Sequence, residues 1–187
     1  GKKIKIEVDE SSNSIIVRDF GRGVPFGIRE DGENVLVSIY TKSHTGGKFS
    51  NDSYKNASGL NGIGGSCVCL SSKQFQVKSY RNGIMASASF VKGELSFYTE
   101  VPTTEPNGTE VLFIPDPEVF CNGEIGFSYE RICEDIKAIS YLYSGIIFVV
   151  TGKLIDGTED RVEFCAKNGI TDFIKDNAYK PLHKHII

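Results

Sequence analysis

Four glycines stand within seven positions between Gly59 and Gly65, and an apolar segment that ends at Leu70 follows them. Glycine lacks a Cβ, so a loop of this kind lets a ligand approach the backbone closely. If the apolar segment is a helix, its unpaired N–H groups and the positive end of its dipole point into the loop, as in sites that hold phosphate. The stretch therefore indicates either a phosphate-binding loop or an ordinary tight turn.

A second candidate for chemistry is Asp19, which ends an apolar strand directly before Gly21 and Gly23. A carboxylate at a buried strand end needs a partner. Adenine offers one, because its exocyclic amino group donates a hydrogen bond while the neighbouring ring nitrogen accepts one through water. Thr109 has a hydroxyl for the same water, and the two glycines let a base lie against the backbone. The alternative is that Asp19 only opens an Asx turn.

The polar, turn-rich segment 46–58 is too long for a hairpin connection, and we expect it to be a functional lid or a disordered loop. Lys48 follows Gly46 and Gly47 in this segment. It is a mobile point charge suited to phosphate oxygens, although a solvated lysine is the alternative. The acidic Gly-x-Gly element, the Gly-Gly-Lys lid and the glycine-rich loop occur in this order, which favours a nucleotide site over three unrelated turns.

Hydrophobic periodicity predicts the elements that position these residues. Alternation indicates strands over 3–9, 14–18, 74–80, 84–90, 95–101, 110–114, 146–150 and 162–165. Helical spacing indicates helices over 35–40, up to residue 70, from Ser128 and after Gly169, and Asn82-Gly83 is a strong hairpin signal. The helix from Ser128 is expected to present one apolar face made of Ile132, Ile136, Ile139 and Tyr143.

This order of elements predicts the fold class. A hairpin comes first, strands then alternate with helices, and a meander follows. We expect an α+β chain, a two-layer α/β sandwich whose helices cover one face of a mixed, mostly antiparallel sheet. No internal repeat or low-complexity linker interrupts residues 1–187, so we expect a single domain.

Composition narrows the class of protein. The 187 residues carry a formal charge of −3, which gives no general attraction to nucleic acid or to anionic membrane. No run of about 18 apolar residues indicates a membrane span, and no leader sequence is recognisable. Five cysteines, an odd number, fit reduced thiols better than a disulfide framework. We therefore expect a cytoplasmic protein with no membrane contact.

Four motifs together resemble a known family. They are Asp19-x-Gly21-x-Gly23, Thr45-Gly46-Gly47-Lys48-Phe49, Ser53-Tyr54-Lys55 and Gly59-Leu60-Asn61-Gly62-Ile63-Gly64. With Gly108-Thr109-Glu110-Val111 and Leu142-x-Ser144-Gly145, they closely resemble the ATPase domain of the B subunits of DNA gyrase and topoisomerase IV. That family belongs to the wider group of gyrase, Hsp90, histidine kinase and MutL ATPases, which have the Bergerat-type ATP-binding fold.

The resemblance implies a role for each matching residue. Asp19 would bind the adenine amino group and share a water with Thr109, Tyr54 would contact adenine from the lid (45–58), and Lys48 would hold the phosphates. Arg22 and Arg81 match the rim where aminocoumarin inhibitors bind in the family. The full set of implied nucleotide-binding residues is Asp19, Gly21, Gly23, Val24, Pro25, Lys48, Tyr54, Gly59, Leu60, Asn61, Gly62, Ile63, Gly64 and Thr109.

The resemblance also implies partners and an activity. The parent protein would be the B subunit of an ATP-hydrolysing type II DNA topoisomerase in which ATP drives dimer closure for strand passage, with ATP and Mg²⁺ as cofactors. The topoisomerase A subunit and DNA would be bound through other domains. The whole protein would be a homodimer and this segment alone a monomer.

Some positions depart from the family pattern. The family's general-base glutamate and magnesium-holding asparagine precede the first hairpin, where this sequence begins, so we expect an N-terminally truncated segment that is catalytically incompetent and holds no metal itself. The tail 169–187 is expected to lead toward a missing transducer domain. Phe20, Asn61 and Gly65 replace residues usual in the family.

Other interpretations stay open. The fold could serve as a non-catalytic interaction module, or the parent could be a MutL-like or chaperone ATPase of the same group. Cys67-x-Cys69 lacks a second pair at zinc spacing and is expected to be two small apolar residues on a buried helix. His44, His183 and His185 are expected to be structural or solvated.

Overall fold

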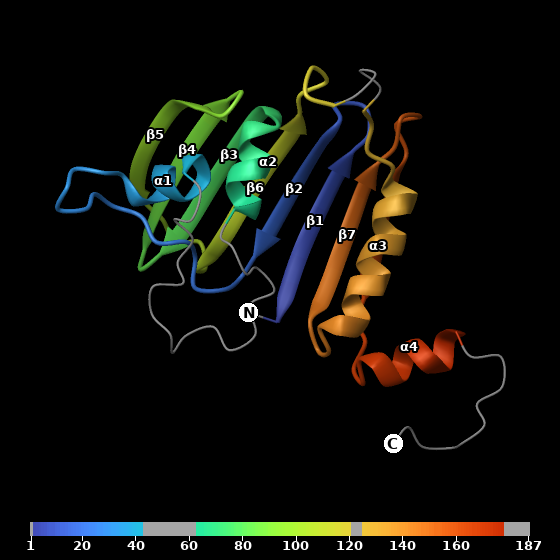
Figure 1. Cartoon of the computed structure of the whole chain (residues 1–187). Helices are drawn as coiled ribbons and strands as arrows, with labels where there is room; N and C mark the ends of the chain where they lie inside the picture. Colours follow the sequence, from blue (N-terminus) through green and yellow to red (C-terminus); the bar gives the residue numbers. More distant parts are fainter. Residues whose placement is uncertain (1, 43–62, 121–124, 178–187) are drawn as a thin grey trace.

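Eight strands form one mixed sheet in the computed structural model, which describes residues 2–42, 63–120 and 125–177 (Figure 1). The strands are β1 (Lys3–Asp9), β2 (Ser14–Asp19), β3 (Ser72–Arg81), β4 (Ile84–Val91), β5 (Glu94–Pro102), β6 (Gly108–Pro115), β7 (Ile147–Lys153) and β8 (Glu159–Phe164). The helices are α1 (Val35–Thr41), α2 (Gly64–Leu70), α3 (Tyr129–Leu142) and α4 (Ile170–Asn177). The strands lie in the order β5-β4-β3-β6-β2-β1-β7-β8.

The sheet is mostly antiparallel, as the sequence predicts. Only β1 and β7 pair in parallel, and every other neighbouring pair is antiparallel. Two tight turns join β3 to β4 and β4 to β5. The central residues Asn82 and Gly83, and likewise Lys92 and Gly93, have positive φ. These turns match the right-handed twist of the strands, so the Asn-Gly hairpin prediction is confirmed.

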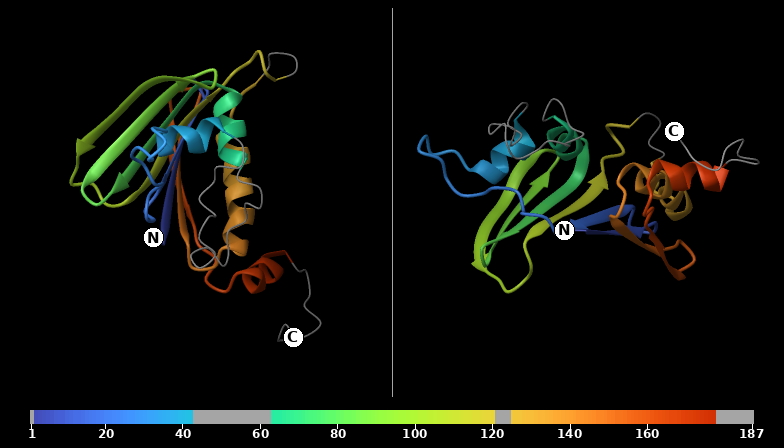
Figure 2. Two further views of the ribbon diagram at one scale, coloured as in Figure 1. Left: turned by 60° about the vertical axis from the view of Figure 1, so that its left-hand side comes forward. Right: turned by 90° about the horizontal axis from the view of Figure 1, so that it is seen from below.

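The helices cover one face of the sheet, and the other face is open (Figure 2). Helices α1 and α2 pack over β3 and β4 through a buried cluster that includes Leu36, Tyr40 and Phe75. Helix α3 packs over β1 and β7 through a second cluster that includes Tyr129 and Val150. The predicted two-layer sandwich is therefore confirmed.

The predicted apolar face of α3 is partly wrong. Ser128 caps the helix as expected, since its Oγ accepts a hydrogen bond from the N–H of Arg131 at 3.3 Å. Ile132 and Ile136 pack into the second cluster, but Ile139 and Tyr143 are exposed. The last turn instead faces α4, where Tyr141 stacks edge-on against Phe173 and donates to Asp176 at 2.7 Å.

The described residues contain no helix with both the length and the apolar character needed to cross a bilayer.

Candidate nucleotide site

Asp19 and Thr109 lie side by side at neighbouring strand ends. Asp19 is the last residue of β2 and Thr109 the second residue of β6. Arg18 pairs with Glu110, so Asp19 and Thr109 follow at the next positions of the two antiparallel strands. Thr109 also pairs with Ser79 of β3. Because opposite residues point to the same face, these three polar side chains share the face that the helices cover.

The carboxylate of Asp19 makes one local hydrogen bond. Its Oδ1 accepts from the N–H of Gly21 at 2.7 Å, which closes the Asx turn that the sequence offered as the alternative. A Cβ on Gly21 would lie only 2.9 Å from this oxygen. One N–H does not saturate a carboxylate, which has about four lone-pair sites, so Oδ2 keeps acceptor capacity for a ligand.

Asp19 faces the side of the sheet on which α1 lies. Tyr40 of α1 is 8% exposed, and its pKa is raised to about 12, first by burial and next by the negative charge of Asp19. The register agrees, because Asp19 stands two residues after Val17, whose partner Val111 packs against the cluster under α1 and α2. The strand-end carboxylate is therefore directed toward the helices rather than away from them.

The segment after Asp19 is fixed to the end of β3. Gly23 has a φ of 74°, and a Cβ there would lie 2.6 Å from the backbone oxygen of Tyr80. Ser79 Oγ donates to the carbonyl of Val24 at 2.6 Å, and Arg81 Nη1 donates to the carbonyl of Gly23 at 3.4 Å. Only glycine fits at position 23, because both the backbone conformation and the close approach exclude a side chain.

An open cavity of about 260 Å³ lies beside this segment, lined by Pro25, Phe26, Arg81, Asn82 and Ile84. It brings together Pro25, expected to line the base pocket, and Arg81, expected at the inhibitor rim. Arg22, the other expected rim residue, is exposed in the loop after β2.

At the other end of the site, α2 begins at Gly64. Its N-cap residue, Ile63, makes no side-chain capping bond. A Cβ on Gly65 would lie 3.2 Å from the Tyr40 ring, whereas one on Gly64 would meet nothing within 4 Å. Several expected site residues lie outside the described part of the chain: Lys48, Tyr54, Gly59, Leu60, Asn61 and Gly62, together with the lid 45–58.

Sequence reasoning missed Ser79, which is fully buried and anchors Val24. The sequence did contain a signal for Ser79. Side chains of a strand alternate between its two faces, so Ser79 lies on the same face of β3 as the apolar Phe75 and Val77. A serine at a core-facing position needs a partner, and a backbone carbonyl is a common one.

The Cys67-x-Cys69 prediction is half wrong, since Cys69 is buried but Cys67 is exposed on the other side of α2. Across residues 2–42, 63–120 and 125–177, no group of three or more His, Cys, Asp and Glu side chains is placed to hold a metal ion.

A larger hollow, of about 620 Å³, lies away from these residues. Glu7, Thr151 and Arg161 are among its lining residues and are register partners on β1, β7 and β8. They lie on the open face, since Glu7 points away from its buried neighbours Ile6 and Val8. Volume alone therefore does not identify the site, and the convergence of polar strand-end residues is the better guide.

The fold is shared with a protein of known structure. No protein-family model matches the chain. In structure it is similar to the 43K ATPase domain of Thermus thermophilus gyrase B, solved in complex with an aminocoumarin, with a TM-score of 0.77 and 27% identity over 98% of this chain and 46% of that one. The eight-stranded sheet with helices on one face is thus the fold of the gyrase B ATPase domain.

In sequence the chain is similar to two kinds of topoisomerase B subunit. The chain is 36% identical over 175 residues to the DNA gyrase B subunit of Streptococcus pyogenes serotype M3, which covers 92% of the chain and 26% of that protein. It is 33% identical over 177 residues to the DNA topoisomerase 4 B subunit of Enterococcus faecalis, which covers 93% of the chain and 25% of that protein. The chain is a homologue of the ATPase domain of gyrase and topoisomerase IV B subunits, and it spans about a quarter of the length of these relatives.

Proposed function

We propose that this chain binds ATP and that Asp19 reads the adenine. The carboxylate accepts a hydrogen bond from the exocyclic amino group, and the Thr109 hydroxyl shares a water with Asp19 and the ring nitrogen. The observation that carries the proposal is the position of Asp19: it ends β2 beside Thr109, on the face toward α1, and among the described residues its one hydrogen bond is that of Oδ1 with the Gly21 N–H. A hydrogen bond to a charged acceptor is among the stronger ones available in a protein site.

We assign the remaining residues to the adenine base, the phosphates and the inhibitor rim. Gly21, Gly23, Val24 and Pro25 line the base pocket, where the fixed backbone after Asp19 presents a narrow surface to the ring. The phosphates lie toward the start of α2, held by Lys48 and the loop Gly59, Leu60, Asn61, Gly62, Ile63 and Gly64, while Tyr54 contacts adenine from the lid. Arg22 and Arg81 form the rim for an aminocoumarin. The cavity shared by Pro25 and Arg81 supports this assignment.

We assign the parent protein to the ATP-hydrolysing type II DNA topoisomerases of the cytoplasm. There, ATP binding would drive closure of a homodimer for DNA strand passage. The topoisomerase A subunit and DNA would be partners of other domains, and the segment itself a monomeric domain with its tail leading toward the transducer domain. A formal charge of −3 supports the view that DNA is not bound by these residues.

The 187-residue chain by itself is expected to bind nucleotide without turning it over. Hydrolysis needs a general base to activate water. The residues assigned here contact only the adenine and the phosphates of the nucleotide. Among the described residues no group of three or more His, Cys, Asp and Glu side chains is placed to hold a metal ion, so we derive no step through the Mg²⁺ expected in the whole protein.

The test is calorimetry of the purified chain with a non-hydrolysable ATP analogue and with an aminocoumarin, beside an ATP turnover assay. The proposal expects saturable heat from both ligands and negligible turnover. No heat from either ligand would contradict the binding assignment. Turnover at a rate typical of intact gyrase would contradict the catalytic one.

A further inference from the structure

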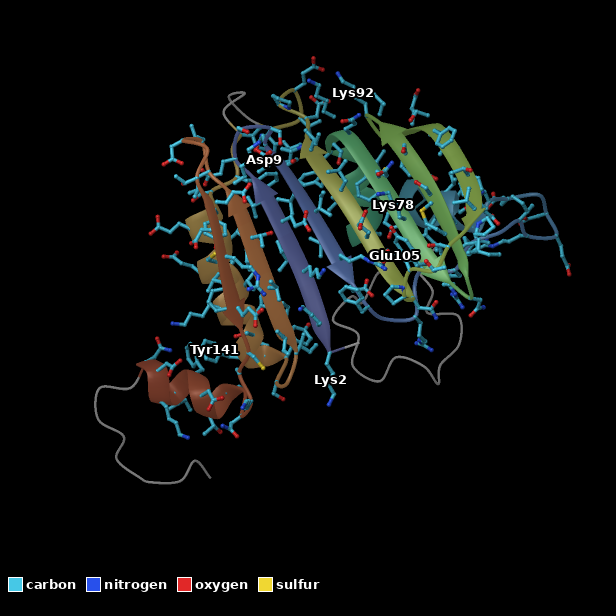
Figure 3. All side chains as sticks on the ribbon, turned by 180° about the vertical axis from the view of Figure 1, so that it is seen from behind. Lys2, Asp9, Lys78, Lys92, Glu105 and Tyr141 are labelled. Carbon is cyan, nitrogen blue, oxygen red and sulfur yellow. The ribbon has the colours of Figure 1, made fainter. Side chains whose placement is uncertain are left out.

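Arg18 is a buried cation directly before Asp19. Its side chain is 7% exposed, although it lies on the open face of the sheet, opposite to the face of Asp19. Figure 3 shows this open face and labels Lys78, which extends from β3 on the same side. A buried charge is costly unless specific partners compensate it, so the surroundings of Arg18 need an explanation.

Two aromatic rings enclose the guanidinium. Its Cζ lies 3.9 Å from the centroid of the Tyr80 ring and 5.1 Å from that of the Phe20 ring. Both distances are within cation–π range, and a planar guanidinium also stacks on rings in a way that an ammonium does not. The Glu110 carboxylate, paired with Lys78 at 2.8 Å, is the register partner of Arg18 across the strands.

The same guanidinium joins β2 to the chain before β6. Nη2 donates to the carbonyl of Pro106 at 2.8 Å. Nη1 is buried with no hydrogen-bond partner in the part of the chain that the structure describes. It packs against Gly108, where a Cβ would lie 2.9 Å from Nη1 and 2.1 Å from the backbone oxygen of Asp19. Any side chain at position 108 would push these segments apart.

Three residues that contact Arg18 are each adjacent in sequence to a residue of the candidate site. Phe20 stands between Asp19 and Gly21, Tyr80 between Ser79 and Arg81, and Gly108 directly before Thr109. Neighbouring residues of a strand point to opposite faces, so a contact on the open face fixes the backbone whose next side chain lies on the covered face.

We propose that Arg18 is a positioning residue that sets the selectivity of the site for adenine. This inference rests on the ATP-binding function proposed above. It adds a residue that holds Asp19 and Thr109, the two residues assigned to adenine, at a fixed spacing. The ladder between β2 and β6 ends at Arg18 and Glu110, so without the stacked guanidinium residues 106–108 lose a direct link to β2 and the spacing of Asp19 and Thr109 relaxes.

Base discrimination is the property most sensitive to that spacing. Guanine presents a carbonyl oxygen where adenine presents its amino group, and a fixed carboxylate repels it. A site built to hydrogen-bond its ligand rejects analogues strongly only while its polar groups stay in place. Phosphate contacts lie at the α2 end of the site, so a looser base pocket lowers the preference for adenine more than it lowers binding of the phosphates.

The test compares Arg18→Leu, Arg18→Lys and the matched control Arg161→Leu by calorimetry with non-hydrolysable ATP and GTP analogues. Arg161 is an exposed arginine of β8 on the same open face. We expect the Kd ratio of the GTP to the ATP analogue to fall about tenfold in Arg18→Leu and by less in Arg18→Lys, with no change in the control. If Arg18→Leu does not fold, Phe20→Leu removes one ring of the stack and should lower the ratio about threefold.

The outcomes separate the two proposals. A folded Arg18→Leu that keeps the wild-type ratio overturns the positioning role and leaves ATP binding standing. A wild-type chain that binds neither analogue, or both equally, overturns the proposed function and the inference with it. A lowered ratio in Arg18→Leu with an unchanged control supports both.

Discussion

The Asp19 carboxylate has to satisfy two demands at once. Its Oδ1 closes the turn with the N–H of Gly21, which is what lets the chain leave β2 sharply. Its charge also reaches Tyr40, whose ring packs against Gly65 at the start of α2. A carboxylate that only stabilised a turn would serve equally well facing solvent, so its direction toward α1 favours a role in binding.

We predict that Tyr40→Phe changes how the free energy of unfolding depends on pH. The pKa of Tyr40 is raised from 10.0 to about 12, because burial and the Asp19 charge disfavour the phenolate. The folded state therefore holds the proton more tightly, and this contribution, about 2 to 3 kcal/mol, is present below pH 10 and is lost between pH 10 and 12. Denaturant unfolding across this window should show a shallower alkaline loss in Tyr40→Phe. Parallel curves for the two proteins would disprove the assignment.

Among the elements, α3 comes very close to β7 at one point of their packed interface. Tyr129, at the start of the helix, lies over Gly152, where a Cβ would be 2.3 Å from the ring. The first residue of the helix is also tied to the β1–β2 turn, since Glu10 Oε1 accepts from the N–H of Tyr129 at 2.8 Å. The ring cannot move away without disturbing this start, so the glycine sets how closely the helix approaches the sheet.

Gly152→Ala should accordingly destabilise the fold by about 1 to 3 kcal/mol, the usual effect of forcing an extra carbon into a packed core. Chemical denaturation measures it. Gly126→Ala is the matched control, because a Cβ there meets nothing within 4 Å and Gly126 has no positive φ. Equal stabilities for the two variants would show that the Tyr129 ring relaxes freely, contrary to this account.

For the whole molecule, the sheet ends in two unlike edges. The edge strand β8 is short and carries four charged residues, which discourage pairing with another chain. The edge strand β5 is longer and exposes Leu95, Phe97 and Val101. Its unpaired backbone groups and apolar side chains make β5 the edge that is more prone to associate with another chain.

We predict that Phe97→Lys raises the concentration at which the chain self-associates. Phe97 is 59% exposed, so the change should alter the free energy of unfolding by about 0.5 kcal/mol or less. Light scattering against concentration reports the onset. Ile170→Lys removes an equally exposed residue, 59%, at the start of α4, which is not part of the sheet. The same shift in both variants would attribute the effect to added charge alone.

The sequence was sufficient to predict the strands, the Asn82-Gly83 turn and the class of sheet, because alternation and turn chemistry are local. It was sufficient to single out Asp19 and Thr109 by their types and motifs. Their adjacency depends on the pairing of β2 with β6, which joins residues far apart in the chain.

The features that sequence reasoning missed are contacts between distant segments. Arg18 is of a residue type that is mostly exposed, yet rings from Phe20 and Tyr80 and the Pro106 carbonyl bury it. The last turn of α3 faces α4 rather than the sheet, because the α4 residues Phe173 and Asp176 contact Tyr141. Helical spacing does not indicate whether the last turn of a helix will contact the sheet or another helix.

Calorimetric titration of Asp19→Asn with a non-hydrolysable ATP analogue shows whether the strand-end carboxylate binds adenine, with the exposed Asp135→Asn of α3 as the control. The amide cannot supply the charged acceptor, whose hydrogen bond contributes about 1.5 to 3 kcal/mol, so Asp19→Asn should bind about tenfold to a hundredfold more weakly while the control matches the wild type. Wild-type affinity in a folded Asp19→Asn chain would contradict the account, because the strand-end carboxylate would then have no part in reading the base.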